Sequence, residues 1–282
     1  MRQLAAPLCF LLCIGLQPAR AADSTDAAPA RSQPKWELGA GLSVFSLPDY
    51  RGADHQTTAT LPFPYAIYRG EIIKADRSGV RGMLFDSERL DLELSLSGGV
   101  PVKSKDNAVR QGMPDLDPTL EIGPQAIVRL LGKASDETRL DLRLPLRQVI
   151  TSGGEGQGLT FTPALNLSIT PPAGWHIGTQ IGLYAGTRQY HRFLYAVDSQ
   201  YATANRPAYQ AQSGYGGWQM TGSLSRRFDK LWLGGFVRLS SVKGAVFDNS
   251  PLVARKTNVS AGIGIAWVFA QSDERVISND DD

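Results

Sequence analysis

The chain has 282 residues, of which 29 are basic, 27 are acidic and 42% are hydrophobic. Arg2 and Arg20 are the only charged residues among the first 21, so 27 basic and 27 acidic residues follow and cancel. This balance excludes the basic excess typical of nucleic-acid binding. Because both cysteines, Cys9 and Cys13, lie in that first segment, the rest has no disulfide framework, thiolate metal site or cysteine nucleophile.

Residues 1–21 have the features of a cleaved secretion signal. Arg2 precedes an apolar run, Leu8 to Leu16, that is too short to span a bilayer as a helix. The small residues Ala19 and Ala21 then offer a cleavage site. Residues 22–35 are small and polar and include proline, which predicts a flexible leader.

From Trp36 to Phe269, apolar and polar residues alternate in repeated segments, which is the pattern of β-strands with one apolar face. The clearest segment, RLDLRLPLRQV at 139–149, has leucines on one face and charges on the other. No helix of useful length is predicted. Strands are expected at 36–44, 61–67, 89–97, 119–131, 139–149, 159–169, 175–183, 190–197, 215–227, 231–241 and 256–269, and 71–85 holds one bulged strand or two short ones.

Three features favour a membrane barrel over a soluble sandwich. Tryptophans stand at strand ends, where an aromatic girdle would lie; they are Trp36, Trp175, Trp232 and Trp267. The polar faces carry charges of both signs, as a salt-bridged interior would. The last strand places Trp267 and Phe269 on its apolar face, and it resembles the C-terminal assembly signal of outer-membrane barrels.

The sequence therefore predicts an all-β fold: a single antiparallel transmembrane β-barrel over 36–269. It has about 12 strands, with 10 as an alternative, and its outer face contacts outer-membrane lipid. The leader at 22–35 and an acidic, mobile C-terminal tail at 270–282 are expected on the periplasmic side.

Four segments resemble one known family. The most specific is RQGMPDLDPTLEIGP at Arg110–Pro124, within the longer run 103–124. The others are PDYRG at 48–52 followed by LPFPY at 61–65, YQAQSGYGGW at 209–218 and DNSPLV at 248–253. In this order they resemble the MipA/OmpV family of MltA-interacting outer-membrane proteins.

The resemblance implies a non-enzymatic scaffold for peptidoglycan-remodelling enzymes. The implied periplasmic partners are a murein hydrolase, the lytic transglycosylase, and a murein synthase. The resemblance brings no catalytic, metal or cofactor residues with it. A narrow channel for small solutes is the alternative function, and a rim-sited lipid hydrolase is a third. The oligomeric state stays open.

Two sets of charged residues are candidate sites. Asp106, Arg110, Asp115 and Asp117 could bind a partner or plug the lumen, although turn chemistry and local ion pairs explain most of them. If 71–85 is one strand, this 103–118 loop is periplasmic. If it is two strands, the loop is extracellular and the number of strands expected in the rest of the barrel is wrong by one. The candidate lumen lining is Asp91, Glu93, Arg139, Asp141, Arg143 and Arg147, either as a selective pore wall or as a structural salt-bridge network.

The three histidines carry the enzyme hypothesis. Outer-membrane lipid hydrolases use a Ser–His pair near the rim, but His55, His176 and His191 lie in no recognisable nucleophile motif. They are also too scattered in sequence to suggest a metal site. We therefore expect no enzyme.

Overall fold

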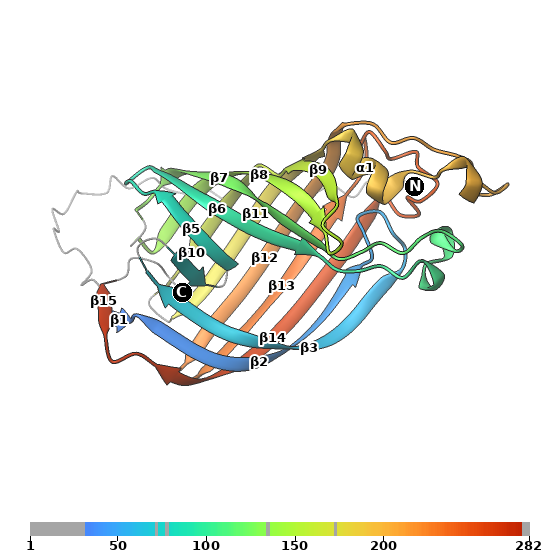
Figure 1. Ribbon diagram of the computed structural model, residues 1–282. Coiled ribbons are helices and arrows are strands. Elements are labelled where there is room, and N and C mark those ends of the chain that lie inside the picture. The colour runs from blue at the N-terminus through green and yellow to red at the C-terminus, as the bar shows by residue number, and fades with distance from the viewer. Residues whose placement is uncertain (1–31, 71–72, 77–78, 134–135, 172–173, 278–282) are drawn as a thin grey trace, which may run out of the picture.

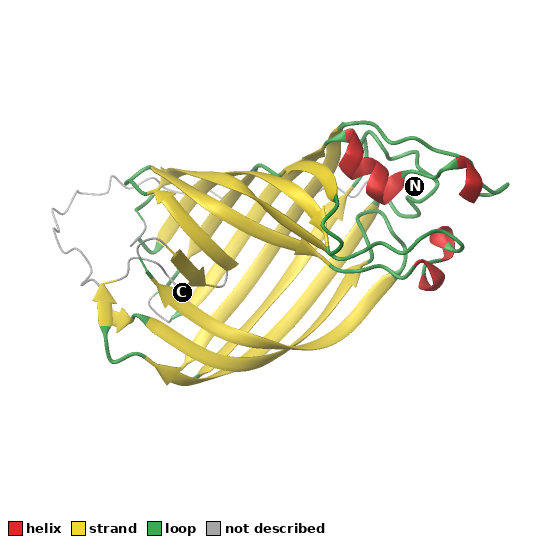
Figure 2. Ribbon diagram, viewed as in Figure 1, coloured by secondary structure: helices red, strands yellow, loops and turns green. Residues whose placement is uncertain are grey.

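The structure is a computed structural model that describes residues 32–70, 73–76, 79–133, 136–171 and 174–277. The expected signal at 1–21, most of the leader and the end of the tail lie outside the described residues. Figures 1 and 2 show strands arranged around a barrel, with the helices and long loops gathered at one end.

The strands are antiparallel and differ widely in length. Their bounds are β1 Ser32–Pro34, β2 Trp36–Pro48, β3 Gln56–Arg69, β4 Ile73–Asp76, β5 Gly79–Phe85, β6 Leu90–Gly99, β7 Thr119–Leu131, β8 Thr138–Thr151, β9 Gly156–Phe161, β10 Ala164–Ile169, β11 Trp175–Gly186, β12 Gly214–Phe228, β13 Leu231–Ser241, β14 Thr257–Gln271 and β15 Arg275–Ile277. The helices are α1, Arg188–Tyr195, and three short 3₁₀ turns at Ser104–Asp106, Ala108–Arg110 and Ser199–Tyr201.

The main sheet closes on itself. Its order is β10-β11-β12-β13-β14-β2-β3-β4-β5-β6-β7-β8-β9, and further pairings join β10 to β8 and β9 to β11. Because β9 and β10 both lie between β8 and β11, they are two pieces of one strand, interrupted at Thr162 and Pro163. The barrel therefore has 12 strand positions, which confirms the predicted fold class.

In one segment the structure selects between two predicted alternatives, and in another it differs from the prediction. Residues 71–85 contain two strands, β4 and β5, which form a short hairpin. The predicted strand at 190–197 is wrong, because residues 188–195 form helix α1. Thr187 caps this helix by accepting a hydrogen bond from the Tyr190 backbone N–H. One strand gained and one lost leave the total at 12.

The extra strand decides where the 103–118 loop lies. With β4 and β5 as separate strands, the connection 100–118 lies at the same end of the barrel as 49–55, 187–213 and 242–256. The first and last residues of the barrel strands, Trp36 and Gln271, lie at the opposite end, where connections such as 229–230 are short (Figure 1).

The wall between β3 and β6 is made of the two shortest barrel strands. β3 pairs with β4 at Tyr68 and Arg69, and β6 pairs with β5 as far as Ser95. Among the described residues, the cap-side part of β3 therefore has a strand partner on the β2 side alone. Pro62 and Pro64 lie in this part, where an edge position tolerates their missing N–H groups.

Large apolar side chains cover the outside of the barrel. On β6, Leu90, Leu92, Leu94 and Leu96 are exposed while the residues between them are buried or polar. On β14, Ile263 is 68% exposed and Trp267 is 61% exposed. An exposed apolar surface of this extent is typical of contact with lipid. None of the described helices is long and apolar enough to cross a membrane.

The apolar face of β3 points inward instead. Tyr65 and Ile67 are buried with Ala266 and Val268, and Trp232 packs against this cluster. The expectation of an outward girdle is therefore wrong for Trp232. Its strand pairs Leu231 with the outward Trp267, so the next residue must face the lumen.

The described parts of the expected leader and tail, residues 32–35 and 270–277, pair with each other. β1 pairs with β15, and β14 continues past the expected end of the barrel at Phe269 to Gln271. Lys35 forms an ion pair with Glu274 at 3.0 Å. Residues 32–35 and 272–277 therefore lie together at the end of the barrel opposite the long loops.

Gly123, in the motif Arg110–Pro124, allows a close approach of two strands. A Cβ at this position would lie 2.0 Å from the Leu146 carbonyl oxygen of β8 and 2.8 Å from the Arg147 Cα. Both neighbours are backbone atoms, which cannot move aside cheaply. This contact gives a physical reason for glycine before Pro124.

We expect Gly123→Ala to destabilise the barrel by about 1–3 kcal/mol, because β7 and β8 would be forced apart. The control is Gly222→Ala on β12, where a Cβ has no atom within 4 Å. Urea unfolding in lipid vesicles, followed by tryptophan fluorescence, measures both. Equal midpoints for the two variants would show that the close approach does not matter.

Candidate functional site in the lumen and cap

Four connections fold together at one end of the barrel, and we call this assembly the cap. It comprises residues 49–55, 100–118, 187–213 and 242–256. Each connection contributes to one apolar cluster, whose buried members are Tyr50, Ala53, Val102, Leu116, Tyr195, Val197, Ala211, Val242, Ala245, Phe247 and Leu252. The Tyr195 and Phe247 rings stack with centroids 3.7 Å apart. The cap is thus a small folded layer with a core of its own.

The loop 49–55 lies at the centre of the cap. The Tyr50 hydroxyl donates to the Leu252 carbonyl at 2.8 Å, and the Tyr195 hydroxyl donates to the Arg51 carbonyl at 2.9 Å. Burial raises the pKa of the Tyr50 hydroxyl well above its usual range, so it stays a hydrogen-bond donor.

The Arg51 side chain extends from this loop to strands β11 and β12. Its guanidinium donates to the Gln219 side chain at 3.0 Å and to the Trp218 carbonyl at 2.9 Å. It also lies over the Tyr184 ring, 4.5 Å from the centroid. Because β13 and β14 separate β12 from β2, Arg51 reaches across the cap-side mouth of the lumen.

His191 on α1 is completely buried beneath the cap. Its Nδ1 lies 2.6 Å from the Gln212 carbonyl oxygen, which requires Nδ1 to carry the proton. The unprotonated Nε2 has no hydrogen-bond partner in the described part of the chain. The His191 and Phe247 ring centroids are 4.7 Å apart. Burial lowers the pKa of His191 below its usual value.

The four predicted residues of the 103–118 loop do not form one site. Arg110 is buried and donates to Ser104, Pro114 and the Leu194 carbonyl, so it ties the loop to itself and to α1. Asp115 accepts from the Ser104 backbone N–H at 2.7 Å, while Asp106 and Asp117 are exposed. Burial lowers the pKa of Arg110.

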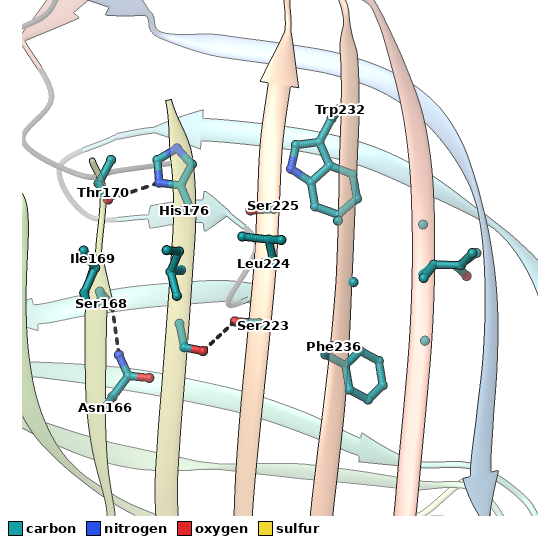
Figure 3. A pocket seen from close by; sticks show the side chains of 18 of the residues that line it. Asn166, Ser168, Ile169, Thr170, His176, Ser223, Leu224, Ser225, Trp232 and Phe236 are labelled. Carbon is teal, nitrogen blue, oxygen red and sulfur yellow. Dashed lines mark hydrogen bonds between the residues drawn. The ribbon is translucent and has the colours of Figure 1, made fainter. Parts of the chain in front are cut away.

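Three cavities lie in a row inside the barrel. The first, about 580 Å³, is near the chain ends; the second, about 420 Å³, is in the middle; and the third, about 370 Å³, lies beneath the cap. Neighbouring cavities share wall residues: Arg81 and Arg143 border the first two, and Arg147 and Arg238 border the last two. Figure 3 shows part of the first cavity.

The predicted lumen residues divide into two groups. Each of the three carboxylates is held by an arginine: the pairs are Asp91 with Arg129 at 2.8 Å, Glu93 with Arg81 at 3.3 Å and Asp141 with Arg139 at 3.0 Å. This group is a structural salt-bridge network along β5 to β8.

The second group, Arg143 and Arg147, forms no direct ion pair among the described residues, although Asp141 and Glu121 act on them electrostatically, and Arg238, which was not predicted, resembles them. Arg147 donates to Ser95 and Gln125, and Arg238 donates to Thr221, so neutral groups hold their charges in place. Arg143 forms no ion pair within the described chain, and its buried Nε has no hydrogen-bond partner. The described wall of the middle cavity carries four arginines and one carboxylate.

The sequence did not identify several residues of this interior. Arg81 lies in the ambiguous segment 71–85, and Arg51 comes from a loop. Arg238 could have been predicted, because it lies an even number of residues from Trp232 on β13 and therefore on the same face of the strand. That signal was missed because Trp232 was assigned to the outer face.

The histidines lie in three separate places. His55 contacts Asp49 at 3.0 Å, His176 contacts Thr170 at 3.3 Å (Figure 3), and His191 lies in the cap. In the part of the chain that the structure describes, these contacts do not join a nucleophile, a base and an orienting carboxylate. No three His, Cys, Asp or Glu side chains among the described residues are placed to hold a metal ion.

Comparison with known proteins gives one sequence match and several structural ones. The family described as MltA-interacting protein MipA matches residues 40–269. No curated protein matches the chain. An outer membrane channel from Pseudomonas putida F1 is similar at 10% identity and a TM-score of 0.48, covering 87% of this chain and 100% of its own. The NanC porin is similar at 8% identity and a TM-score of 0.37, covering 82% and 98%.

We expect acid to loosen the cap through His191. Since its pKa is lowered in the folded state, its contribution to stability is present above the unfolded value of about 6.5 and is lost as pH falls further. Protease cleavage within 187–213 should therefore be faster at pH 5 than at pH 7.5. His191→Asn, which does not titrate, should cut this difference, whereas His55→Gln should keep it. An unchanged ratio in His191→Asn would assign the pH response to another group.

Proposed function

The chain belongs to the MltA-interacting protein MipA family, and on that premise we propose that it is an outer-membrane β-barrel whose lumen is a narrow channel for small solutes. The observation that carries this proposal is the row of three cavities that share wall residues from the chain ends to the cap. A barrel of 12 strands lies between the filled eight-stranded type and the open porins, so an incompletely filled lumen is expected.

The outer surface supports the membrane location. Leucine, isoleucine and aromatic side chains face outward on both β6 and β14. Near the chain ends, Trp175 packs edge-on against Phe228, and Arg226 lies 4.7 Å from the Phe228 ring centroid. Aromatic and basic side chains at this level suit a membrane–water interface.

The cap makes the proposed channel narrow. Tyr190 and Tyr195 of the cap and Tyr184 of β11 border the third cavity, and Arg51 crosses the mouth above it. Solutes would pass this end around the Arg51 side chain or when the loop 49–55 moves.

The first measurement is single-channel conductance of the refolded chain in a planar bilayer. We expect steady conductance, and we expect Arg51→Ala to raise it by removing the side chain that bridges the mouth. The control is Arg255→Ala, an exposed cap residue for which no side-chain contact is found in the described chain. If neither the native barrel nor Arg51→Ala conducts, with folding of both verified by circular dichroism, the channel is excluded.

A second candidate function follows from the family's name: contact with the lytic transglycosylase MltA, as a scaffold for peptidoglycan-remodelling enzymes. The paired strands β1 and β15 support it, because they form an ordered surface at the end of the barrel opposite the cap. The loop 103–118, the other contact segment that the sequence suggested, lies at the opposite end. The strand pair and the loop therefore cannot both face the periplasm. Periplasmic turns of outer-membrane barrels are short, so the end with β1 and β15, where the connections are short, is the one expected to face the periplasm.

Deleting residues 272–282 should abolish capture of MltA by the purified barrel in a pull-down. The control variant changes Lys105 to Ala and Asp106 to Asn in the exposed part of the 103–118 loop and should leave capture intact. Capture that survives the deletion would remove the strand pair as the contact. A rim-sited lipid hydrolase has no comparable support in the geometry.

A further inference from the structure

The cavity nearest the chain ends has two unlike walls. One wall, on β2, β3, β13 and β14, presents aromatic rings. The other, on β5 and β8, presents arginines. We propose that this cavity binds an amphipathic organic anion, that is, a carboxylate carrying an apolar ring or chain. The inference deepens the proposed channel by naming its substrate class and rests on that function for its biological meaning.

The aromatic wall is built on glycines. Phe63 lies over Gly41: a Cβ there would be 2.4 Å from the phenyl ring. Trp232 covers Gly234 in the same way, at 2.4 Å, and Phe236 lies 2.7 Å from a Cβ built on Gly262.

Because these glycines have no side chains, the rings lie flat against the barrel wall instead of filling the lumen. Figure 3 shows Trp232 and Phe236 along β13, and Gly234 lies between them on the same face of the strand. Phe63 and Trp232 are edge-to-face with centroids 6.4 Å apart, so they form one continuous apolar surface. A surface of this kind binds an apolar ring or chain.

The opposite wall carries positive charge without a matching carboxylate. Arg81, Arg139 and Arg143 border the cavity, and no Asp or Glu does so among the described residues. Arg81 and Arg139 are paired with Glu93 and Asp141. Arg143 is different, since it has no ion pair in the described chain and its buried Nε has no partner.

Asp141 and Glu93 act on Arg143 electrostatically, but neither forms an ion pair with it in the described chain. A buried guanidinium without a direct ion pair favours an anion, and a carboxylate can accept two parallel hydrogen bonds from it. The arginines come from β5 and β8, whereas the rings come from β2, β3 and β13. In the order of strands, β8 lies across the barrel from β14 and β2, so Arg143 lies on the wall opposite the rings. A volume of about 580 Å³ is within the range of small-molecule sites.

The neighbouring cavity supports the same sign of charge. Arg147 and Arg238 add two further cations toward the cap that form no direct ion pair among the described residues, with Glu93 and Glu121 as the carboxylates nearest to Arg147. An anion that leaves the first cavity would therefore meet further arginines along the lumen, which is the arrangement that concentrates anions in a narrow passage.

Binding can be measured whether or not the barrel conducts. The full chain is placed in lipid nanodiscs and titrated calorimetrically with 4-phenylbutyrate, using empty nanodiscs as the blank. The matched probes are 4-phenylbutan-1-ol, which lacks the charge, 4-phenylbutylamine, which inverts it, and acetate, which lacks the ring. We expect 4-phenylbutyrate to bind roughly tenfold or more tightly than any of the three.

Three variants test the two walls separately. Arg143→Gln should reduce affinity for 4-phenylbutyrate to that for the alcohol. Trp232→Ala should weaken the binding of the acid and the alcohol alike. Gly264→Leu should block the cavity without touching a charge, since a Cβ there has its nearest contact at 3.5 Å. The controls are Arg255→Gln in the cap and Gly222→Leu on β12, where a Cβ meets no atom within 4 Å.

The outcomes separate this inference from the channel proposal. Selective binding that depends on Arg143 and Trp232, in a barrel that never conducts, would uphold the site and exclude the channel. Conductance without selective binding would do the reverse. Equal affinity for acid and alcohol, equal affinity for 4-phenylbutyrate and acetate, or insensitivity to all three variants would overturn the site.

Discussion

The rest of the structure depends on closure of the β-sheet by backbone hydrogen bonds. Lipid offers no partner for an exposed N–H or C=O group, so a sheet that crosses a membrane must pair its first strand with its last. Here β2 pairs with β14 over Glu37 to Ser46, and β8 pairs with β10 across the interrupted strand. Closure fixes which residues of each strand face inward, and that parity decides the chemistry of the lumen. Among the described residues, the backbone pairing between neighbouring strand positions is shortest at the hairpin of β4 and β5, where β3 and β4 pair over two residues.

Inside the barrel, glycine and arginine together keep the lumen from filling. Aromatic residues that face inward would normally pack into a solid core. On β2, β13 and β14 they lie over glycines, so their rings cover the wall and leave space beside them. Arginines on the other wall border the remaining space and give that wall a positive charge. Those paired with carboxylates stabilise the wall, whereas Arg143, Arg147 and Arg238 form no direct ion pair among the described residues.

The cap shows how long loops can be ordered without regular strands. Each of its four connections contributes apolar residues to one core, and side chains such as Tyr50 and Arg110 satisfy backbone carbonyls of neighbouring loops. This apolar core orders the loops at the rim and holds Arg51 across the mouth of the lumen. His191 introduces a titratable group at the junction between the cap and the barrel.

The sequence by itself determined the barrel and the inward position of alternating charges, because a period of two is a local property of the chain. The predicted total of 12 strands agrees with the structure because the strand lost at 190–197 is offset by the second strand in 71–85. The four family segments, from Pro48 to Val253, also identified the family correctly. Three features were decided by tertiary structure. Residues 188–195 form a helix, which Thr187 caps, where the alternation predicted a strand at 190–197. Trp232 faces inward because its register with β14 places Leu231 on the outer face. Asp141 lies two residues from both Arg139 and Arg143 on one face of β8, and it is the folded structure that pairs its carboxylate with Arg139, at 3.0 Å, and places it 3.7 Å from Arg129 of the neighbouring strand β7. Strand register, which long-range pairing sets, is therefore the information that the alternation of residues does not contain.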